Sequence, residues 1–238
     1  MAKKVRHGAT FWDHEYTHAE HLKLSDEVSE DLEKFLRFLA RHKNTMVRQH
    51  PHVLDLGCGN GRNLIHLAKN IQARGYGYDT SAAAIKQARL ASEGLPLTYE
   101  VRSIAGVLDL PDNSQDIVID MMASHFLSNA EREFLRNEIM RVLRPGGWYF
   151  IKTFLRDEDI HTSRLLKEAG TEEEGTYIHP IIGVPEHVYF EHELVEFMQD
   201  GEFVVESVHK SHRHRTTQGK AGKRRTISIY ARKDPYAK

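Results

Sequence analysis

The sequence has a single cysteine, Cys58, among its 238 residues. One cysteine excludes an internal disulfide bond and a zinc site built from cysteine ligands. Long apolar runs are also absent, so no membrane-spanning segment is expected. The basic N-terminal residues have no apolar stretch behind them, so no secretory signal is expected either. These absences predict a soluble, cytoplasmic protein with no membrane partner.

Net charge is low as well, because 34 Asp and Glu residues oppose 33 Lys and Arg residues. Positive charge is instead concentrated in the stretch HKSHRHRTTQGKAGKRR, which we call the basic segment; it spans residues 209–225 and contains no acidic residue. Such a segment can follow the phosphates of RNA, hold an anionic small molecule, or remain a solvated loop. The charge pattern alone leaves all three interpretations open.

Apolar runs and amphipathic helical patterns alternate along most of the chain, whose length suits a single α/β domain. Apolar residues at helical spacing predict a helix over about 26–41, and Ser128 and Glu131 predict a capping box that begins a later helix. Five largely apolar segments are interpreted as strands: 52–56, 75–79, 97–103, 116–122 and 148–154. Strands that alternate with helices predict a doubly wound, parallel sheet with helices on both faces.

The last third of the chain departs from this pattern. A short helix is expected near 160–169, followed by a loop rich in Gly, Pro and His that includes residues 177–190. Segments 202–209 and 225–232 are interpreted as two further strands. Only the basic segment separates these two strands, so they should pair antiparallel.

The stretch VLDLGCGNGRNLIHLA, residues 53–68, carries the clearest chemical signal. A strand is followed by Gly57, Gly59 and Gly61 and then by a helix. Glycines let a ligand approach the backbone closely, and the start of a helix offers unpaired N–H groups. Asp79 follows at the end of the second strand, where its carboxylate can accept both hydroxyls of a ribose. The two features predict an adenosine-containing cofactor at the carboxyl edge of the sheet.

These motifs resemble those of the class I S-adenosylmethionine (SAM)-dependent methyltransferases. Four stretches carry the resemblance: VLDLGCGNG, GYDTS, LDLPDNSQDIVIDMMASHFL and RVLRPGGWYF, the last of which holds the turn before the fifth strand. The continuation GCGNGRN is similar to the tellurite-resistance-type and related small-molecule methyltransferases. The resemblance implies a Rossmann-like sheet of seven strands, five parallel and two forming an antiparallel pair, with the last strand beside the fifth. It also implies a single domain over 1–238, made of an N-terminal helical lid, a SAM-binding core and a tail with the substrate loop: 1–45, 50–154 and 155–238.

The resemblance further implies which residues bind SAM, whose product is S-adenosylhomocysteine. Asp79 would bind the ribose hydroxyls, Ser103 and Ile104 would bracket the adenine, and Asp55 would hold the glycine loop. Trp12, one helical turn before Tyr16, would fold over the cofactor. The full set of expected cofactor residues is Trp12, Tyr16, Asp55, Gly57, Cys58, Gly59, Gly61, Asp79, Thr80, Ser103, Ile104 and Met121.

His125 follows the fourth strand and is the candidate general base, with a structural role in that loop as the alternative. Cys58 lies inside the glycine loop, which favours a small packed residue over a nucleophile. His14, His18 and His21 share one helical face and could hold a metal ion. A polar face of the lid helix is the simpler interpretation, so no metal is expected.

Topology brings the 177–190 loop and the basic segment toward the rim where the parallel strands end. The expected substrate residues are Tyr177, His179, His187, Arg213, Arg224 and Arg225. We therefore expect transfer of a methyl group from SAM to a small, anionic molecule by in-line displacement. Two alternatives remain open: methylation of RNA through the basic segment, and SAM binding without catalysis.

Overall fold

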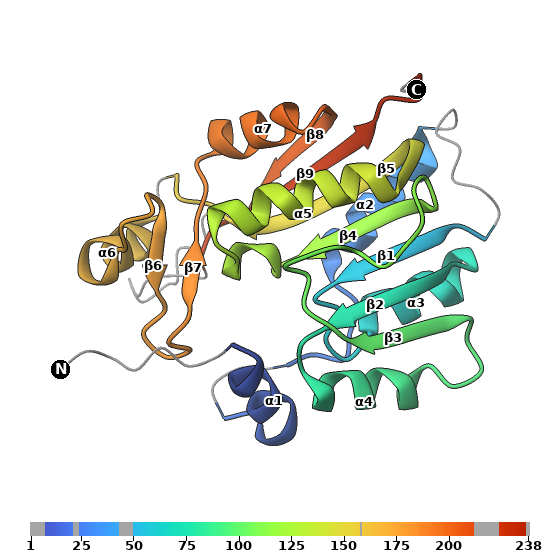
Figure 1. Cartoon of the computed structure of the whole chain (residues 1–238), viewed down its shortest axis with the longest axis horizontal. Coiled ribbons are helices and arrows are strands. Elements are labelled where there is room, and N and C mark those ends of the chain that lie inside the picture. The colour runs from blue at the N-terminus through green and yellow to red at the C-terminus, as the bar shows by residue number, and fades with distance from the viewer. Residues whose placement is uncertain (1–7, 21–23, 43–49, 158, 212–223, 237–238) are drawn as a thin grey trace, which may run out of the picture.

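The computed structural model describes residues 8–20, 24–42, 50–157, 159–211 and 224–236 (Figure 1). Seven strands form one sheet in the order β3-β2-β1-β4-β5-β9-β8. Their bounds are His52–Leu56 for β1, Arg74–Asp79 for β2, Leu97–Val101 for β3, Gln115–Met121 for β4, Leu143–Phe154 for β5, Phe203–Lys210 for β8 and Thr226–Lys233 for β9. The predicted Rossmann-like α/β architecture is therefore confirmed.

The sheet is mixed, with parallel and antiparallel pairs of strands. Strand β1 is parallel to both β2 and β4, β2 is parallel to β3, and β4 is parallel to β5. Strand β9 lies between β5 and β8 and is antiparallel to both. The carboxyl ends of β1, β2, β4 and β5 consequently meet at one edge of the sheet, where ligands bind in folds of this kind.

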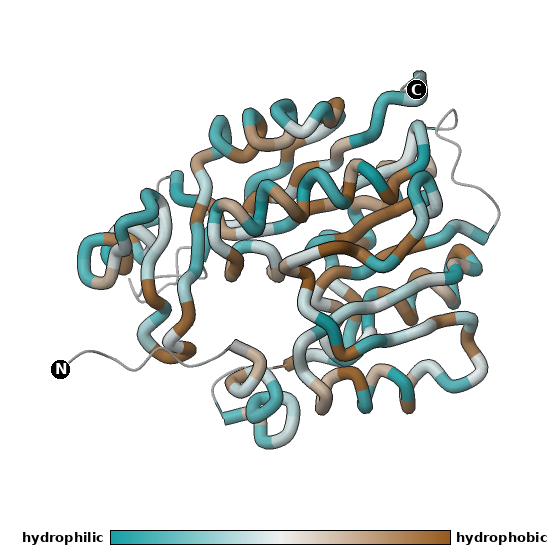
Figure 2. The backbone as a smooth tube through the Cα atoms, in the orientation of Figure 1, coloured by the Kyte–Doolittle hydropathy of each residue, from teal (hydrophilic) through white to brown (hydrophobic). Residues whose placement is uncertain are grey.

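Helices cover both faces of the sheet because alternate strand residues point to opposite sides. Helices α2 (Glu30–Arg41), α3 (Arg62–Ile71) and α4 (Ala82–Ala91) pack with Ile117 and Ile119 of β4 in one core. Helices α5 (Asn129–Val142) and α7 (Glu191–Asp200) pack with Val118 in the other core. Six of the seven residues of β4 are buried, as expected for a strand covered on both sides. Figure 2 shows hydrophobic residues running along this central strand.

Local sequence signals account for several helix ends. The predicted capping box is present at the start of α5, where the backbone N–H of Ser128 donates to the Glu131 carboxylate at 2.8 Å. The predicted helix over 26–41 begins slightly later, as α2, and buries Leu32, Phe35 and Leu39 along one side. No helix in the described ranges combines the length and the apolar character needed to cross a bilayer.

Two expectations need correction. The RPGG stretch, expected as a turn before the fifth strand, lies inside β5, where the register with β4 shifts between Gln115 and Ile117. Residues expected as a loop form a second, two-stranded antiparallel sheet of β6 (Thr176–Ile178) and β7 (Pro185–His187). Tyr177 and Val188 of this hairpin region are buried against α6 (Ile160–Ala169). Strands of three residues are too short to produce a visible alternation in the sequence.

Candidate active site

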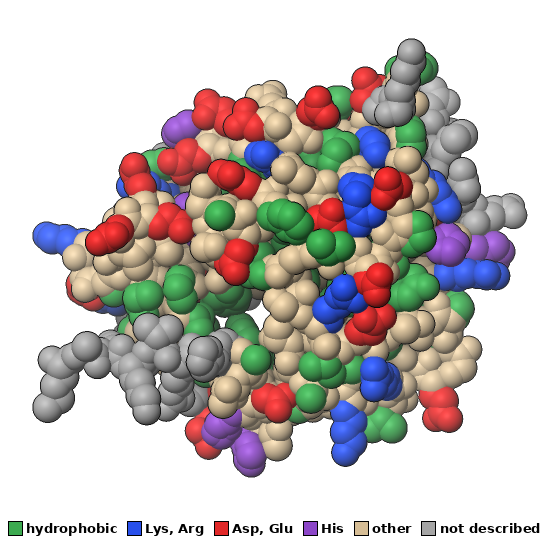
Figure 3. All heavy atoms as spheres, in the orientation of Figure 1, with side chains coloured by type: hydrophobic (Ala, Val, Ile, Leu, Met, Phe, Trp, Pro, Cys, Tyr) green, Lys and Arg blue, Asp and Glu red, His purple; other side chains and the backbone are tan. Residues whose placement is uncertain are grey.

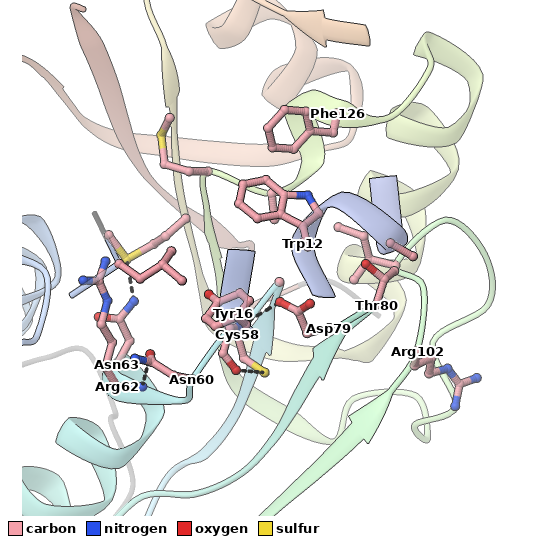
Figure 4. Close-up of a pocket in the computed structure, with 18 of the residues that line it drawn as sticks. Trp12, Tyr16, Cys58, Asn60, Arg62, Asn63, Asp79, Thr80, Arg102 and Phe126 are labelled. Carbon is pink, nitrogen blue, oxygen red and sulfur yellow. Dashed lines mark hydrogen bonds between the residues drawn. The ribbon is translucent and has the colours of Figure 1, made fainter. Parts of the chain in front are cut away.

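A cavity of about 470 Å³, the main cavity, opens at the carboxyl ends of the parallel strands (Figure 4). Of the predicted cofactor residues, the following line it: Trp12, Tyr16, Gly57, Cys58, Gly59, Asp79, Thr80, Ser103, Ile104 and Met121. Asp55 and Gly61 are not in its described lining. Residues from five separate chain segments thus converge on one space of a size typical of small-molecule sites.

The glycine loop passes close beneath helix α1 (Gly8–His18). The backbone N–H groups of Gly57 and Cys58 both donate to the carbonyl of Tyr78, at 2.8 and 3.0 Å, which fixes the loop to the end of β2. Gly59 has a φ of +55°, and a Cβ at this position would come within 2.1 Å of the Tyr16 hydroxyl. Glycine suits residue 59, because the left-handed backbone disfavours other residues and an added side chain would displace the Tyr16 ring.

The Asp79 carboxylate is fixed by two backbone N–H groups. Oδ2 accepts from Gly59 at 2.9 Å, and Oδ1 accepts from Ser81 at 2.9 Å. Burial raises the pKa of Asp79, and the two backbone donors oppose that shift. A carboxylate oxygen can accept more than one hydrogen bond, so each oxygen can still receive a hydroxyl from the cavity.

Two further carboxyl groups lie beneath the loop. Burial, and then the nearby charges of Asp79 and Asp120, raise the pKa of Asp55 to about 8. Asp55 is 2% exposed, and its Oδ2 atom has no hydrogen-bond partner among the described residues. Asp120 accepts from the backbone N–H groups of Ala123 and Ser124 at 3.3 and 3.1 Å. The Asp120 side chain thereby fixes the short helix η1 (Ser124–Phe126) at the cavity wall.

Helix α1 covers the main cavity with aromatic side chains. Trp12 packs edge-to-face on Phe126 of η1, with ring centroids 5.6 Å apart. Figure 4 shows the Trp12 ring between Phe126 and the Tyr16 and Asp79 side chains. Phe11 of the same helix is buried and packs with Ile182 in the connection between β6 and β7. One helix therefore bridges the sheet edge and the small hairpin.

His125 does not belong to the described lining of the main cavity. It is 1% exposed, and neither ring nitrogen has a hydrogen-bond partner among the residues that the structure describes. Burial lowers the pKa of His125 to about 4, while Glu186 opposes the shift and Arg224 adds to it. The imidazole is therefore neutral at pH 7, and its role as a base stays a prediction.

Four of the expected substrate residues, Tyr177, His179, His187 and Arg224, lie together near β6 and β7, outside the described lining of the main cavity. The Arg224 guanidinium pairs with Glu186 at 2.5 Å and lies 3.3 Å from the centre of the Phe154 ring. The Tyr177 hydroxyl also donates to Glu186. His187 contacts the Thr176 hydroxyl through Nδ1 at 2.8 Å, and His179 accepts from backbone N–H groups of its own turn.

Other described residues of the basic segment are bound to the protein itself: Lys210 at the end of β8 pairs with Glu191. The backbone N–H of Arg225 donates to Asp159 at 2.7 Å, and its guanidinium donates to the carbonyl of Asp157 at 3.1 Å. Arg213 lies outside the described residues. The substrate role predicted for these arginines and for the hairpin residues therefore stays a prediction.

Sequence reasoning missed several residues that line the main cavity. Arg62 and Asn63 belong to the first turn of α3, and Lys152 lies near the end of β5. Lys152 forms an ion pair with Asp31 of α2. The rule that ligands bind at the carboxyl ends of parallel strands, applied to the fifth strand, would have identified Lys152.

The histidine cluster of α1 is only partly described. The rings of His14 and His18 pack edge-to-face with centroids 4.7 Å apart. His21 lies outside the described residues. Within the described ranges, no three His, Cys, Asp or Glu side chains are placed to hold a metal ion together.

Comparison with known proteins agrees with this geometry. Residues 53–147 match a family model described as a methyltransferase domain. The chain is 35% identical over 136 residues to phthiotriol/phenolphthiotriol dimycocerosates methyltransferase 1 of Mycobacterium ulcerans, covering 57% of this chain and 48% of that protein. It is 28% identical over 131 residues to a sterol 24-C-methyltransferase of Aspergillus fumigatus, covering 52% and 34%. The matches span less than half the length of these curated relatives.

Solved structures share the fold at lower identity. A SAM-dependent methyltransferase of Methanosarcina mazei superposes with a TM-score of 0.67 at 22% identity, covering 87% of this chain and 99% of that one. The 1,6-didemethyltoxoflavin-N1-methyltransferase of Burkholderia thailandensis, solved with 1,6-didemethyltoxoflavin and S-adenosylhomocysteine, gives 0.69 at 17% identity, covering 95% and 87%. Residues 53–147 of this chain therefore belong to the class I SAM-dependent methyltransferases, whose cofactor is SAM, and the solved structures show that the chain shares their fold.

Proposed function

We propose that this chain transfers a methyl group from SAM to a nucleophilic atom of a small molecule. The observation that carries the proposal is the main cavity, which joins the glycine loop and Asp79 to an apolar wall on one side. A cavity of about 470 Å³ suits a small-molecule site. The names of relatives point the same way, since they refer to lipids, a sterol and a small heterocycle.

SAM would lie along the edge of the sheet. Asp79 would accept the two ribose hydroxyls, and the adenine would lie near Thr80, Ser103 and Ile104. Arg62 at the start of α3 would attract the carboxylate of the methionine moiety, because the start of a helix and a guanidinium both favour an anion. Asp55 would support the loop from below without touching the ligand.

The acceptor would occupy the end of the main cavity beside η1. Trp12, Met122, Phe126 and Leu127 line the cavity with apolar surface, which favours an acceptor with an apolar or aromatic body. The anionic character expected from the basic segment stays a prediction. Three cations line the cavity, Arg62, Arg102 and Lys152, and Lys152, which also pairs with Asp31, would recognise such a group.

The reaction would be an in-line displacement at the methyl carbon. SAM supplies a sulfonium leaving group when bound, so the protein mainly has to orient the two reactants. Orientation of this kind contributes on the order of 7–11 kcal/mol to lowering a barrier. Trp12 and Phe126 would press the acceptor toward the methyl group and exclude water. A base is needed only for an acceptor that carries a proton on its nucleophilic atom.

RNA methylation and SAM binding without catalysis are the alternatives. Figure 3 shows one face of the molecule, on which the Lys and Arg side chains of described residues lie singly or beside Asp and Glu. RNA-binding surfaces usually gather basic residues over a face, and the described residues in this view form no such patch. The cytoplasmic location expected from the sequence stays a prediction.

A labelling experiment tests the proposal. Methyl-labelled SAM is incubated with the protein and a cell extract, which is then separated into RNA, protein, lipid and small-molecule fractions. Label in the lipid or small-molecule fraction is expected, and an Asp79→Ala variant should abolish it. Label in RNA would overturn the small-molecule acceptor. No label in any fraction, together with measurable SAM binding, would favour the non-catalytic alternative.

A further inference from the structure

Asp13 of α1 caps a different helix, α4. Its Oδ1 atom accepts from the hydroxyl of Ser81 at 2.8 Å and from the backbone N–H of Ala83 at 2.9 Å. The Ser81 hydroxyl in turn accepts from the backbone N–H of Ala84 at 3.1 Å. Two N–H groups at the start of α4 are therefore satisfied, one by Ser81 and one by a carboxylate from α1. These bonds hold the pKa of Asp13 below its usual value.

The same turn carries the ribose-binding acid. The backbone N–H of Ser81 donates to Asp79, and the other oxygen of Asp79 accepts from Gly59. Gly59 lies beneath the Tyr16 hydroxyl, which belongs to α1. The contacts run from Asp13 through Ser81, Asp79, Gly59 and Tyr16 and back to α1. Helix α1 and the cofactor motifs are thus joined in a closed ring.

A second bond fastens the other end of α1. The Gln87 side-chain amide of α4 donates to the carbonyl of Tyr16 at 2.6 Å. Asp13 and Gln87 together hold α1 along α4 at two points, near its middle and near its end. Asp13 is not in the described lining of the main cavity, so any effect that it has on SAM must pass through the position of α1 or through Ser81 to Asp79.

We propose that Asp13 is a positioning residue for SAM. By capping α4, its carboxylate holds α1 where Trp12 and Tyr16 cover a cofactor bound to Asp79. The proposal rests on the proposed function only in taking SAM as the ligand of the main cavity. Because coupling between two events is reciprocal, bound SAM should hold α1 in place as firmly as α1 retains SAM.

The test compares Asp13→Ala with Asp13→Asn. Alanine removes the cap, whereas asparagine keeps an oxygen that can accept from Ala83. We expect SAM to bind about tenfold more weakly to Asp13→Ala, through faster dissociation, and within about threefold of wild type to Asp13→Asn. The exposed acid Glu93 provides the control. Glu93→Ala also removes one negative charge, but at a residue to which no capping role is assigned, and it should leave SAM affinity unchanged.

Chymotrypsin cleavage gives a readout that general destabilisation would not reproduce. In wild type, S-adenosylhomocysteine should slow cleavage at Phe11, Trp12 and Tyr16, and in Asp13→Ala this protection should be lost. Ser81→Ala removes the other half of the cap and should act in the same direction if Asp13→Ala does not fold. Wild-type affinity and intact protection in both alanine variants would overturn the proposal. Wild-type protein that fails to bind SAM would instead overturn the proposed function.

Discussion

The hydroxyl of Tyr16 lies directly over Gly59, so close that a Cβ on residue 59 would come within 2.1 Å of the oxygen. The φ of Gly59, +55°, would also cost a non-glycine residue about 1–2 kcal/mol. Gly59→Ala should therefore displace α1 and raise the dissociation constant of SAM at least tenfold, as measured by calorimetry. Adding Tyr16→Phe removes the hydroxyl and should restore part of the affinity. No recovery in the double variant would show that the ring is not the obstacle.

Asp79→Ala tests the ribose-binding acid. A hydrogen bond to a charged group contributes about 1.5–3 kcal/mol, and the proposed site provides two of them to the ribose. SAM affinity should fall at least 100-fold, while the thermal transition shows that the chain still folds. Asp112→Ala is the matched control, because Asp112 is an exposed acid that pairs with Arg141 away from the main cavity. Equal affinity in the two variants would remove Asp79 from the site.

The buried His125 predicts a dependence of stability on pH. Its folded pKa, about 4, lies below the ordinary value of 6.5, so the unfolded chain takes up a proton first. The contribution of His125 to the free energy of unfolding should therefore fall as the pH drops from about 6.5 toward 4, whereas that of Asp55, whose pKa is raised to about 8, should rise. His125→Phe keeps a ring against Phe126 and Phe154 and removes the titrating group. Urea unfolding at pH 7.5, 5.5 and 4.5 should give a flatter profile in this variant.

Some pH dependence should remain in His125→Phe, because burial also lowers the pKa of His187, to about 3. An unchanged profile would mean that His125 is not buried in its neutral form. The same variant tests whether His125 is the general base. Methyl transfer that persists in His125→Phe at pH 7.5 would exclude His125 as the base, since phenylalanine cannot accept a proton.

Arg132 fastens the hairpin of β6 and β7 to α5. Its side chain is 2% exposed, and it donates to the carbonyl of Leu127 and to the Glu173 carboxylate, each at 2.5 Å. Removing one partner of a buried pair costs about 3–5 kcal/mol, and the partial exposure of Glu173 places Arg132→Met toward the lower end. Arg164→Met is the control, since its pair with Glu168 is exposed on both sides. Similar unfolding midpoints in the two variants would contradict this role for Arg132.

Sequence patterns formed by neighbouring residues were sufficient to predict much of this fold. The capping box at Ser128 and the glycine loop each depend on neighbours in the sequence, and both are present. The pair of Arg224 and Glu186 joins residues that are 38 positions apart, and no local pattern marks it. Because the sequence does not reveal this pair, the charge of Arg224 led to the prediction that its side chain contacts an anionic substrate. Lys152 lies in a strand whose apolar residues mark it as part of the core, and nothing beside it in the sequence shows that the end of this strand lines the cavity.

The place of β9 between β5 and β8 affects how the chain must assemble during translation. Strand β5 has no neighbour on one side until residues 226–233 have left the ribosome, because its partner there is β9. Meanwhile the apolar run from Trp148 to Phe154 offers an unpaired edge to other chains, which favours aggregation. Nascent chains that stall before Thr226 should therefore depend on chaperones far more than finished ones.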